Sequence, residues 1–288
     1  ICTLMFTNIF IKKNRKQLNQ WKKKWGVLLF LRFQTIYTTN NLSFTNIELI
    51  KDLAAQNFSR HISENVYPGR GIVLGRNHEN SWIVIYWIMG RSSNSRNRIF
   101  TYKNGILSTR LADSSMVGDQ SLIIYNAMLD LGDCIVVSNG NHTETIYKGL
   151  EDSKSFYKAL HAEKHEPDAP NYTPRISGII QREEGAMTLS IISKSDFSVD
   201  CSEHSFYRYT DIVPGYGHCL TTYMSDGNPL PSFKGAPLML PLKGNADQIA
   251  NYYWQGLDRA NRISLAVREL TQTGEDQVKI INRNKLES

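Results

Sequence analysis

The feature of this sequence that most restricts its fold is a series of short apolar runs, each bounded by turn residues. The runs are rich in Ile, Val, Trp and Tyr and are short, which favours β-strands over helices. In the first half they are Ile72–Leu74, Trp82–Met89, Ile99–Tyr102, Ile106–Arg110, Leu122–Leu129 and Cys134–Val137. Asn104-Gly105 is a typical two-residue hairpin turn between two of them.

The second half adds helical spacing to this strand pattern. Residues 143–162 predict a helix, and a long helical stretch opens at Asn245, with apolar positions that continue through Leu270. A short amphipathic helix is predicted earlier, over Ile47–Phe58. Further strands are predicted at Arg175–Ile180, Met187–Ile192, Phe206–Tyr209, His218–Tyr223 and Val278–Ile281. Hairpin strands alternating with helices indicate an α+β layered fold rather than a βαβ parallel sheet.

The net charge of +6 is unevenly distributed along the 288 residues. Residues 1–47 hold 8 of the 33 basic residues and no acidic one, which leaves 25 basic against 27 acidic residues in the remainder. The body of the chain is therefore slightly acidic, and its composition does not favour nucleic-acid binding. We expect residues 1–47 to be a basic tail, either disordered or translated from upstream of the true start, and residues 48–288 to form one domain.

Other patterns narrow the functional class. Cys2, Cys134, Cys201 and Cys219 show neither a CxxC spacing nor a disulfide framework, and the His residues form no metal-ligand pattern. The longest apolar stretch of the tail, Trp25–Phe33, is too short to cross a membrane. We therefore expect a reduced, cytoplasmic protein without a metal or cofactor; its oligomeric state, including a homo-oligomer, stays open.

Three polar segments are candidates for a binding site. Arg91–Arg98 concentrates guanidinium groups suited to phosphate and carbonyl oxygens, although a polar hairpin loop would have the same composition. Ser138–Thr143 ends a predicted strand and opens a helix, so it is either an anion-binding terminus with His142 as an acid or base, or a simple helix cap. Glu166–Ile176 is a proline-rich loop that would hold a carboxylate rigidly or merely connect two elements.

Taken in order, these segments resemble the archaeal-type IMP cyclohydrolase family. The matching elements are Gly69-Arg70, Arg91-Ser92 with Asn97-Arg98, Tyr125-Asn126, Asn139-Gly140 with His142-Thr143, and Asn171–Ile176. The resemblance implies a four-layer αββα sandwich like that of N-terminal-nucleophile hydrolases. It also implies ring closure of a formamido-imidazole-carboxamide ribonucleotide to IMP, the last step of purine synthesis. No Cys, Ser or Thr near Glu48 stands where a mature N-terminal nucleophile would be expected.

The resemblance also implies roles for individual residues. Glu166 would transfer protons, with Asp168 as the alternative; Arg98 would bind the formyl oxygen, and Tyr125 would position the substrate or relay a proton. The expected substrate-binding residues are Arg70, Arg91, Ser92, Asn97, Asn126, Asn139, Gly140, His142, Thr143, Asn171 and Arg175. Two other functions stay open: an amide hydrolase of the same fold, and a noncatalytic protein that binds purine nucleotides.

Overall fold

The computed structural model describes residues 47–115 and 123–285. The chain divides into two units, residues 1–52 and 53–288, and the fold described here is that of the second. The predicted basic tail lies almost entirely outside the described residues, as do Cys2 and Leu122. Among the described residues, no helix has the length and apolar composition needed to cross a lipid bilayer.

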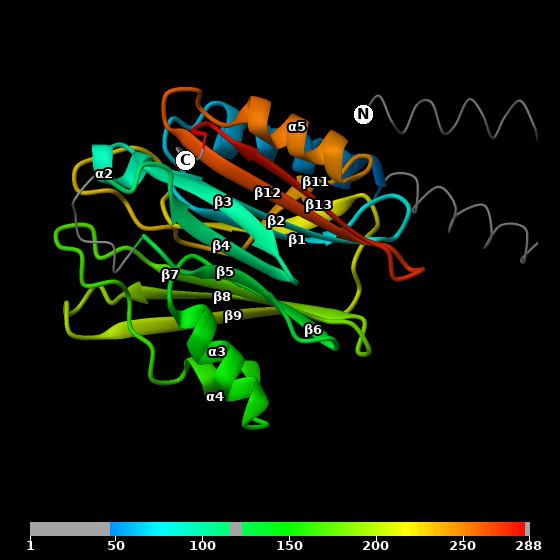
Figure 1. The fold of residues 1–288 in the computed structure, drawn as a ribbon, viewed down its shortest axis with the longest axis horizontal. Helices are drawn as coiled ribbons and strands as arrows, with labels where there is room; N and C mark the ends of the chain where they lie inside the picture. Colours follow the sequence, from blue (N-terminus) through cyan, green and yellow to red (C-terminus); the bar gives the residue numbers. More distant parts are fainter. Residues whose placement is uncertain (1–46, 116–122, 286–288) are drawn as a thin grey trace, which may run out of the picture. The chain divides into compact units, whose positions relative to one another are not determined.

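The named strands form two antiparallel sheets (Figure 1). The six-stranded sheet has the order β11-β10-β1-β2-β12-β13, and the seven-stranded sheet has the order β3-β4-β5-β6-β7-β8-β9. The strands of the first are β1 (Gly71–Arg76), β2 (Trp82–Met89), β10 (Tyr216–Thr221), β11 (Leu238–Pro241), β12 (Arg262–Leu270) and β13 (Asp276–Asn282). Those of the second are β3 (Arg98–Lys103), β4 (Ile106–Leu111), β5 (Asn126–Asp130), β6 (Cys134–Ser138), β7 (Arg175–Gln181), β8 (Ala186–Lys194) and β9 (Ser202–Tyr209).

Helices cover the outer face of each sheet (Figure 1). On the six-stranded sheet these are α5 (Ala246–Gly256) and the π-helical turn η1 (Ser59–Ser63), which continues the helical residues 53–58. On the seven-stranded sheet they are α3 (His142–Glu151) and α4 (Phe156–Leu160). A short helix α2 (Ser93–Arg96) lies in the connection between β2 and β3.

Three apolar cores hold these layers together. The largest lies between the sheets and includes Leu74, Val84, Ile176 and Leu189. A second core packs α5 and η1 against the six-stranded sheet, and a third packs α3 and α4 against the seven-stranded sheet. The alternation of strand side chains explains this division, because successive residues of β2 point to opposite faces of the sheet.

The structure confirms most of the predicted strands, including β2 with the predicted bounds. Asn104 and Gly105 both have positive φ, 51° and 79°, as the predicted hairpin turn between β3 and β4 requires. The strand predicted from Leu122 starts at Asn126. The β11 strand was not predicted, since its four residues lie in a proline-rich region.

Two helix predictions were wrong in their extent. The helix opening at Asn245 ends at Gly256, and Ile263–Leu270 belongs to β12 instead. Leu265 and Val267 face the helical layer, while Ala266 faces the other sheet, so the side chains alternate with a period of two. The same apolar positions also fit part of a helical spacing, which explains the wrong prediction. The helix predicted over residues 143–162 is interrupted after Glu151, where Ser153 takes a positive φ of 58°.

Candidate functional site

Five of the predicted site residues meet at one end of the space between the sheets. Arg70 precedes β1, Arg98 opens β3, Tyr125 precedes β5, Glu166 lies in the loop before β7, and Arg175 opens β7. Arg98 and Glu166 are each only 1% exposed. These residues converge because their strands begin at the same end of the sandwich. We call Arg70, Arg98, Tyr125 and Glu166 the central cluster.

The charged members of the central cluster are incompletely satisfied. Arg70 Nε, Arg98 Nη1 and Glu166 Oε2 are buried atoms without a hydrogen-bond partner among the described residues. The Arg70–Glu166 ion pair is long, with Nη2 and Oε2 3.9 Å apart. Buried polar atoms normally have partners, so donors and an acceptor left open in one place indicate a binding site for a polar ligand.

Backbone carbonyls hold the Arg98 side chain in place. Its Nε donates to Ser95 O at 2.8 Å and its Nη2 donates to Met89 O at 3.2 Å. Ser92 helps to fix Ser95, because the two residues form a capping box at the start of α2. The Arg91–Arg98 segment is thus a short capped helix that delivers one arginine to the interior, with Nη1 unpaired.

Burial and opposing charges tune the titratable groups of the cluster. Burial raises the pKa of Glu166, and the charge of Arg70 only partly offsets this. Burial alone would lower the pKa of Arg70, but Glu166 and neighbouring tyrosines outweigh it and raise that pKa well above its usual value. Arg70 therefore stays charged, while Glu166 is poised to exchange a proton closer to neutral pH.

Two tyrosine hydroxyls meet beside these arginines. The oxygens of Tyr86 and Tyr125 lie 2.6 Å apart in the core, where Tyr86 is fully buried and stacks on Phe100. Burial raises the pKa of Tyr125, whereas the charges of Arg98 and Arg70 lower it. Tyr125 thus connects the apolar core to the charged groups.

Both carboxylate oxygens of Asp168 accept hydrogen bonds from within its own loop. It accepts hydrogen bonds from the Thr173 backbone N–H at 2.6 Å and from the Thr173 hydroxyl. That hydroxyl also contacts the Tyr223 hydroxyl at 2.5 Å, and the Glu166 N–H donates to Thr173 O at 2.9 Å. Asp168 therefore fixes the loop that carries Glu166.

Arg175 and His142 form the wall next to Glu166. Arg175 donates to Lys164 O at 2.7 Å, to Asn141 Oδ1 at 2.9 Å and to His142 Nδ1 at 3.2 Å. Since Arg can only donate, His142 Nδ1 accepts and its Nε2–H is left for Ile176 O, 3.3 Å away. Burial and the Arg175 charge lower the pKa of His142 to about 3, so it is neutral.

Gly140 has no side chain, which lets the polar atoms of Arg175, His142 and Glu166 lie close to its backbone. A Cβ at this position would lie 3.1 Å from Arg175 Nη1, 3.3 Å from His142 Nδ1 and 3.5 Å from Glu166 Oε1. A larger side chain would therefore displace the groups beside the Glu166 carboxylate.

Several predicted binding residues serve the framework in this structure. Asn139 bridges Pro174 O and the Ile176 N–H, Asn97 bridges the backbone of Asp113, and Thr143 bonds to Gly140 O. Asn171 accepts from the Leu230 N–H. Arg91 lies at the surface, paired with Asp226 and with its guanidinium 4.9 Å from the Tyr67 ring centre. These residues shape the site without reaching the central cluster.

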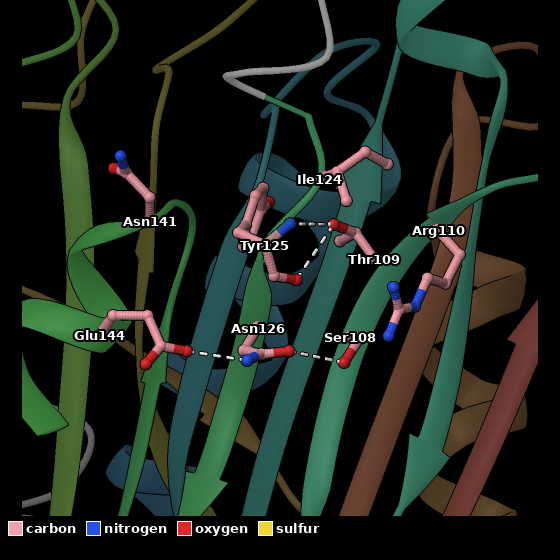
Figure 2. Close-up of a pocket in the computed structure, with 8 residues that line it drawn as sticks. All are labelled: Ser108, Thr109, Arg110, Ile124, Tyr125, Asn126, Asn141 and Glu144. Atoms are coloured by element: carbon pink, nitrogen blue, oxygen red, sulfur yellow. Dashed lines mark hydrogen bonds between the residues drawn. The ribbon is translucent and has the colours of Figure 1, made fainter.

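Asn126 lines a separate pocket on the other face of the seven-stranded sheet. Its amide donates to Glu144 at 2.7 Å and accepts from Ser108 at 2.7 Å, as Figure 2 shows. The pocket has a volume of about 230 Å³. Its lining residues are Ser108, Thr109, Arg110, Ile124, Tyr125, Asn126, Asn141 and Glu144. Tyr125 and Asn141 join it to the central cluster and its wall, but Arg70, Arg98 and Glu166 do not line it.

Sequence reasoning gave no site role to Tyr86, Thr173 or Tyr223, although Thr173 lies within the matched element Asn171–Ile176. Tyr86 is a lone hydroxyl inside the apolar run of β2, which was the only available signal. Tyr223 ended a predicted strand and carried no signal of its own; burial raises its pKa to about 12, with Arg70 opposing. Within residues 47–115 and 123–285, no group of three His, Cys, Asp or Glu side chains is placed to hold a metal ion.

Comparison with known proteins places the chain in a family. Residues 67–275 match the family described as IMP cyclohydrolase-like protein. The IMP cyclohydrolase of Methanocaldococcus jannaschii is 25% identical over 224 residues, covering 76% of this chain and all of that protein. Those of Methanococcus aeolicus and Methanococcus maripaludis are 23% and 32% identical over 162 and 127 residues, covering 55% and 42% of this chain and 74% and 62% of their own lengths. The match spans every member of the central cluster, and the chain belongs to the IMP cyclohydrolase-like family.

Proposed function

We propose that this chain is an IMP cyclohydrolase that works in the ring-closing direction, converting 5-formamidoimidazole-4-carboxamide ribonucleotide to IMP and water. Membership of the family and the names of the three methanogen relatives support the activity. The observation that carries the proposal is the central cluster, in which two arginines and one carboxylate are buried together with unsatisfied atoms.

The chemistry of ring closure matches what these atoms can do. The carboxamide nitrogen loses a proton and forms a bond to the formyl carbon, whose oxygen takes up negative charge. That oxygen then leaves as water, with a second proton from the formamide nitrogen. The reaction therefore needs a proton acceptor, a donor for the developing oxyanion, and a proton for the leaving oxygen.

Each need has a candidate in the cluster. Glu166, with its raised pKa, would accept the carboxamide proton and return it to the leaving oxygen. The unpaired Nη1 of Arg98 would donate to the formyl oxygen. Tyr125 would hold or relay a proton between Glu166 and the formyl oxygen bound by Arg98, since the charges of Glu166 and Arg98 both act on it.

The other two arginines of the site, Arg70 and Arg175, would bind the substrate or hold its surroundings in place. Arg70 would bind the carboxamide or phosphate through its open Nε, and Arg175 would hold Gly140 and His142 against the base. The layered arrangement of two sheets with outer helices supports a sandwich of the N-terminal-nucleophile hydrolase kind. Ring closure as written uses no covalent nucleophile, so such a fold would serve here without its terminal residue.

The test is an absorbance assay of the full chain with the formylated ribonucleotide as substrate. We expect IMP to form in stoichiometric amount with loss of the precursor. Binding of IMP without consumption of the precursor would contradict the proposal and favour a noncatalytic nucleotide-binding protein. Release of formate instead of IMP would favour an amide hydrolase.

A further inference from the structure

The fully enclosed hydroxyl of Tyr86 has one hydrogen-bond partner among the described residues, the hydroxyl of Tyr125. A tyrosine hydroxyl carries a single proton. If Tyr125 donated to Tyr86, the Tyr86 proton would be buried without an acceptor, which is unfavourable. The favourable arrangement is therefore the one in which the Tyr86 hydroxyl donates and the Tyr125 oxygen accepts.

This direction frees the Tyr125 proton for another acceptor. Tyr125 is 7% exposed, and Arg70, Arg98 and Glu166 all act on it electrostatically. Of these, only Glu166 can accept a hydrogen bond, and its Oε2 is a buried acceptor without a partner. The Tyr125 proton thus points to the side of the pair where the substrate would bind.

We propose that Tyr86 is a positioning residue: its hydroxyl donates to Tyr125 and so aims the Tyr125 proton at the reacting groups of the substrate. The proposal rests on the function proposed above for the role of Tyr125. The charges of Arg70 and Arg98 reach Tyr86, but its hydrogen bond is made to Tyr125 and it would act on the substrate through that residue. Its place in the middle of β2, paired to β1 and β12 and stacked on Phe100, makes it a rigid support.

The acidities of the two phenols agree with this direction. Burial and the neighbouring Tyr125 raise the pKa of Tyr86 well above its usual value. Burial also raises the pKa of Tyr125, but the charges of Arg98 and Arg70 and the hydrogen bond with Tyr86 oppose that rise. The weaker acid is thus the enclosed phenol, and the pair would lose its first proton from Tyr125.

The first test needs no substrate. In protein labelled with carbon-13 at tyrosine Cζ, the pKa of Tyr125 is followed in the wild type and in Tyr86→Phe. Loss of a donated hydrogen bond should raise the Tyr125 pKa. If Tyr125 were the donor, loss of its acceptor would lower that pKa, and a fall or no change would overturn the proposal.

The second test uses kinetics. We expect Tyr86→Phe to lower kcat about tenfold, the factor for losing one ordinary hydrogen bond, with KM little changed. The basic limb of the kcat profile should move to higher pH. Tyr86→Phe should cause no further loss in the Tyr125→Phe background, because Tyr86 acts through Tyr125. An equal loss in both backgrounds would contradict the proposal.

Tyr253→Phe is the matched control. Its hydroxyl is equally buried and donates to Pro241 O at 3.0 Å, but Tyr253 belongs to α5 and lies in the core between that helix and the six-stranded sheet. We expect this variant to change the melting temperature and to leave both kcat and the Tyr125 pKa unchanged.

If Tyr86→Phe does not fold, 3-fluorotyrosine at position 86 replaces it. This residue keeps the hydroxyl and is a stronger donor, so it should lower the Tyr125 pKa. A rise would overturn the proposal. Failure of the wild type to form IMP would reject the proposed function, while the two pKa measurements would still decide the direction of the Tyr86 hydrogen bond.

Discussion

Two groups of charged side chains lie at opposite ends of β5, and they differ in burial and in how completely they are paired. At the far end, Arg268 donates to Asp276 at 2.8 and 2.7 Å and also to Asp130, which Arg182 reaches at 2.7 Å. These four residues, the distal cluster, balance two positive against two negative charges.

The central cluster has the opposite character. It holds two arginines and one carboxylate, of which only Arg70 and Glu166 form an ion pair, 3.9 Å long, and two donors and one acceptor stay open. The distal cluster also leaves Arg182 Nε and Arg268 Nη1 without partners, but both guanidinium groups are paired to carboxylates through other atoms. The partly exposed charges of the distal cluster are paired within the fold and join the two sheets, whereas the buried charges of the central cluster are left open to a ligand.

The largest effect that would test this contrast comes from Glu166→Gln. Removing the proton acceptor while keeping its shape should lower kcat by about 10²-fold to 10⁴-fold, with little change in substrate affinity. The measurement is steady-state conversion of the formylated ribonucleotide to IMP. Wild-type turnover in this variant would remove Glu166 from the mechanism and leave the central cluster without a base.

The same substitution in both clusters sharpens the comparison. Arg98→Lys should lower kcat about 10²-fold, because a lysine keeps the charge but cannot donate to two carbonyls and the substrate together. Arg268→Lys should leave kcat unchanged and lower the free energy of unfolding by about 2 kcal/mol, through lost ion pairs in the distal cluster.

Kinetics and urea unfolding of the two lysine variants provide the measurement, and each variant is the control for the other. A loss of activity in Arg268→Lys at full stability, or a loss of stability alone in Arg98→Lys, would reverse the roles assigned to the two clusters.

A smaller effect is expected for Asp168→Asn. Its amide can no longer accept from Thr173 at both oxygens, so we expect the free energy of unfolding to fall by about 1 kcal/mol and kcat to fall less than tenfold. Thermal unfolding and the ring-closure assay measure the two quantities. A loss of kcat as large as that of Glu166→Gln would make Asp168 the proton-transfer carboxylate instead.

The smallest effect is the pH dependence of stability, which should have opposite signs in the two clusters. Glu166 has a raised pKa, so its contribution is present below its unfolded pKa of about 4.3 and is lost as the pH rises through the folded pKa. Although burial opposes it, hydrogen bonds from the Gly132 N–H and from Arg268 lower the pKa of Asp130. The contribution of Asp130 is therefore present above its unfolded pKa of about 3.9 and is lost as the pH falls through the folded pKa.

The melting temperature of Glu166→Gln relative to the wild type should therefore rise as the pH increases above about 4, whereas that of Asp130→Asn should fall as the pH increases up to about 4. Parallel pH profiles for both variants would show that the two clusters are energetically alike.

The alternation of side chains along the chain determined most of the strands. The Trp82–Met89 run specified β2, and Asn104-Gly105 specified the hairpin between β3 and β4, because both signals are local. The β12 strand was misassigned for a related reason: Leu265 and Val267 fit a helical spacing in part, and only packing against two different layers distinguishes the alternatives.

The ordered motifs also gave the family and the residues Arg70, Arg98, Tyr125 and Glu166. Sequence could not separate Glu166 from Asp168, two carboxylates in one loop, because their difference lies in the bonds from Thr173 to Asp168. Nor could it find Tyr86, whose role depends on Tyr125, 39 residues further along the chain. Local patterns determined the strands and the chemistry available; the contact between the sheets decided which polar atoms are enclosed, which are paired and which are left open for a substrate.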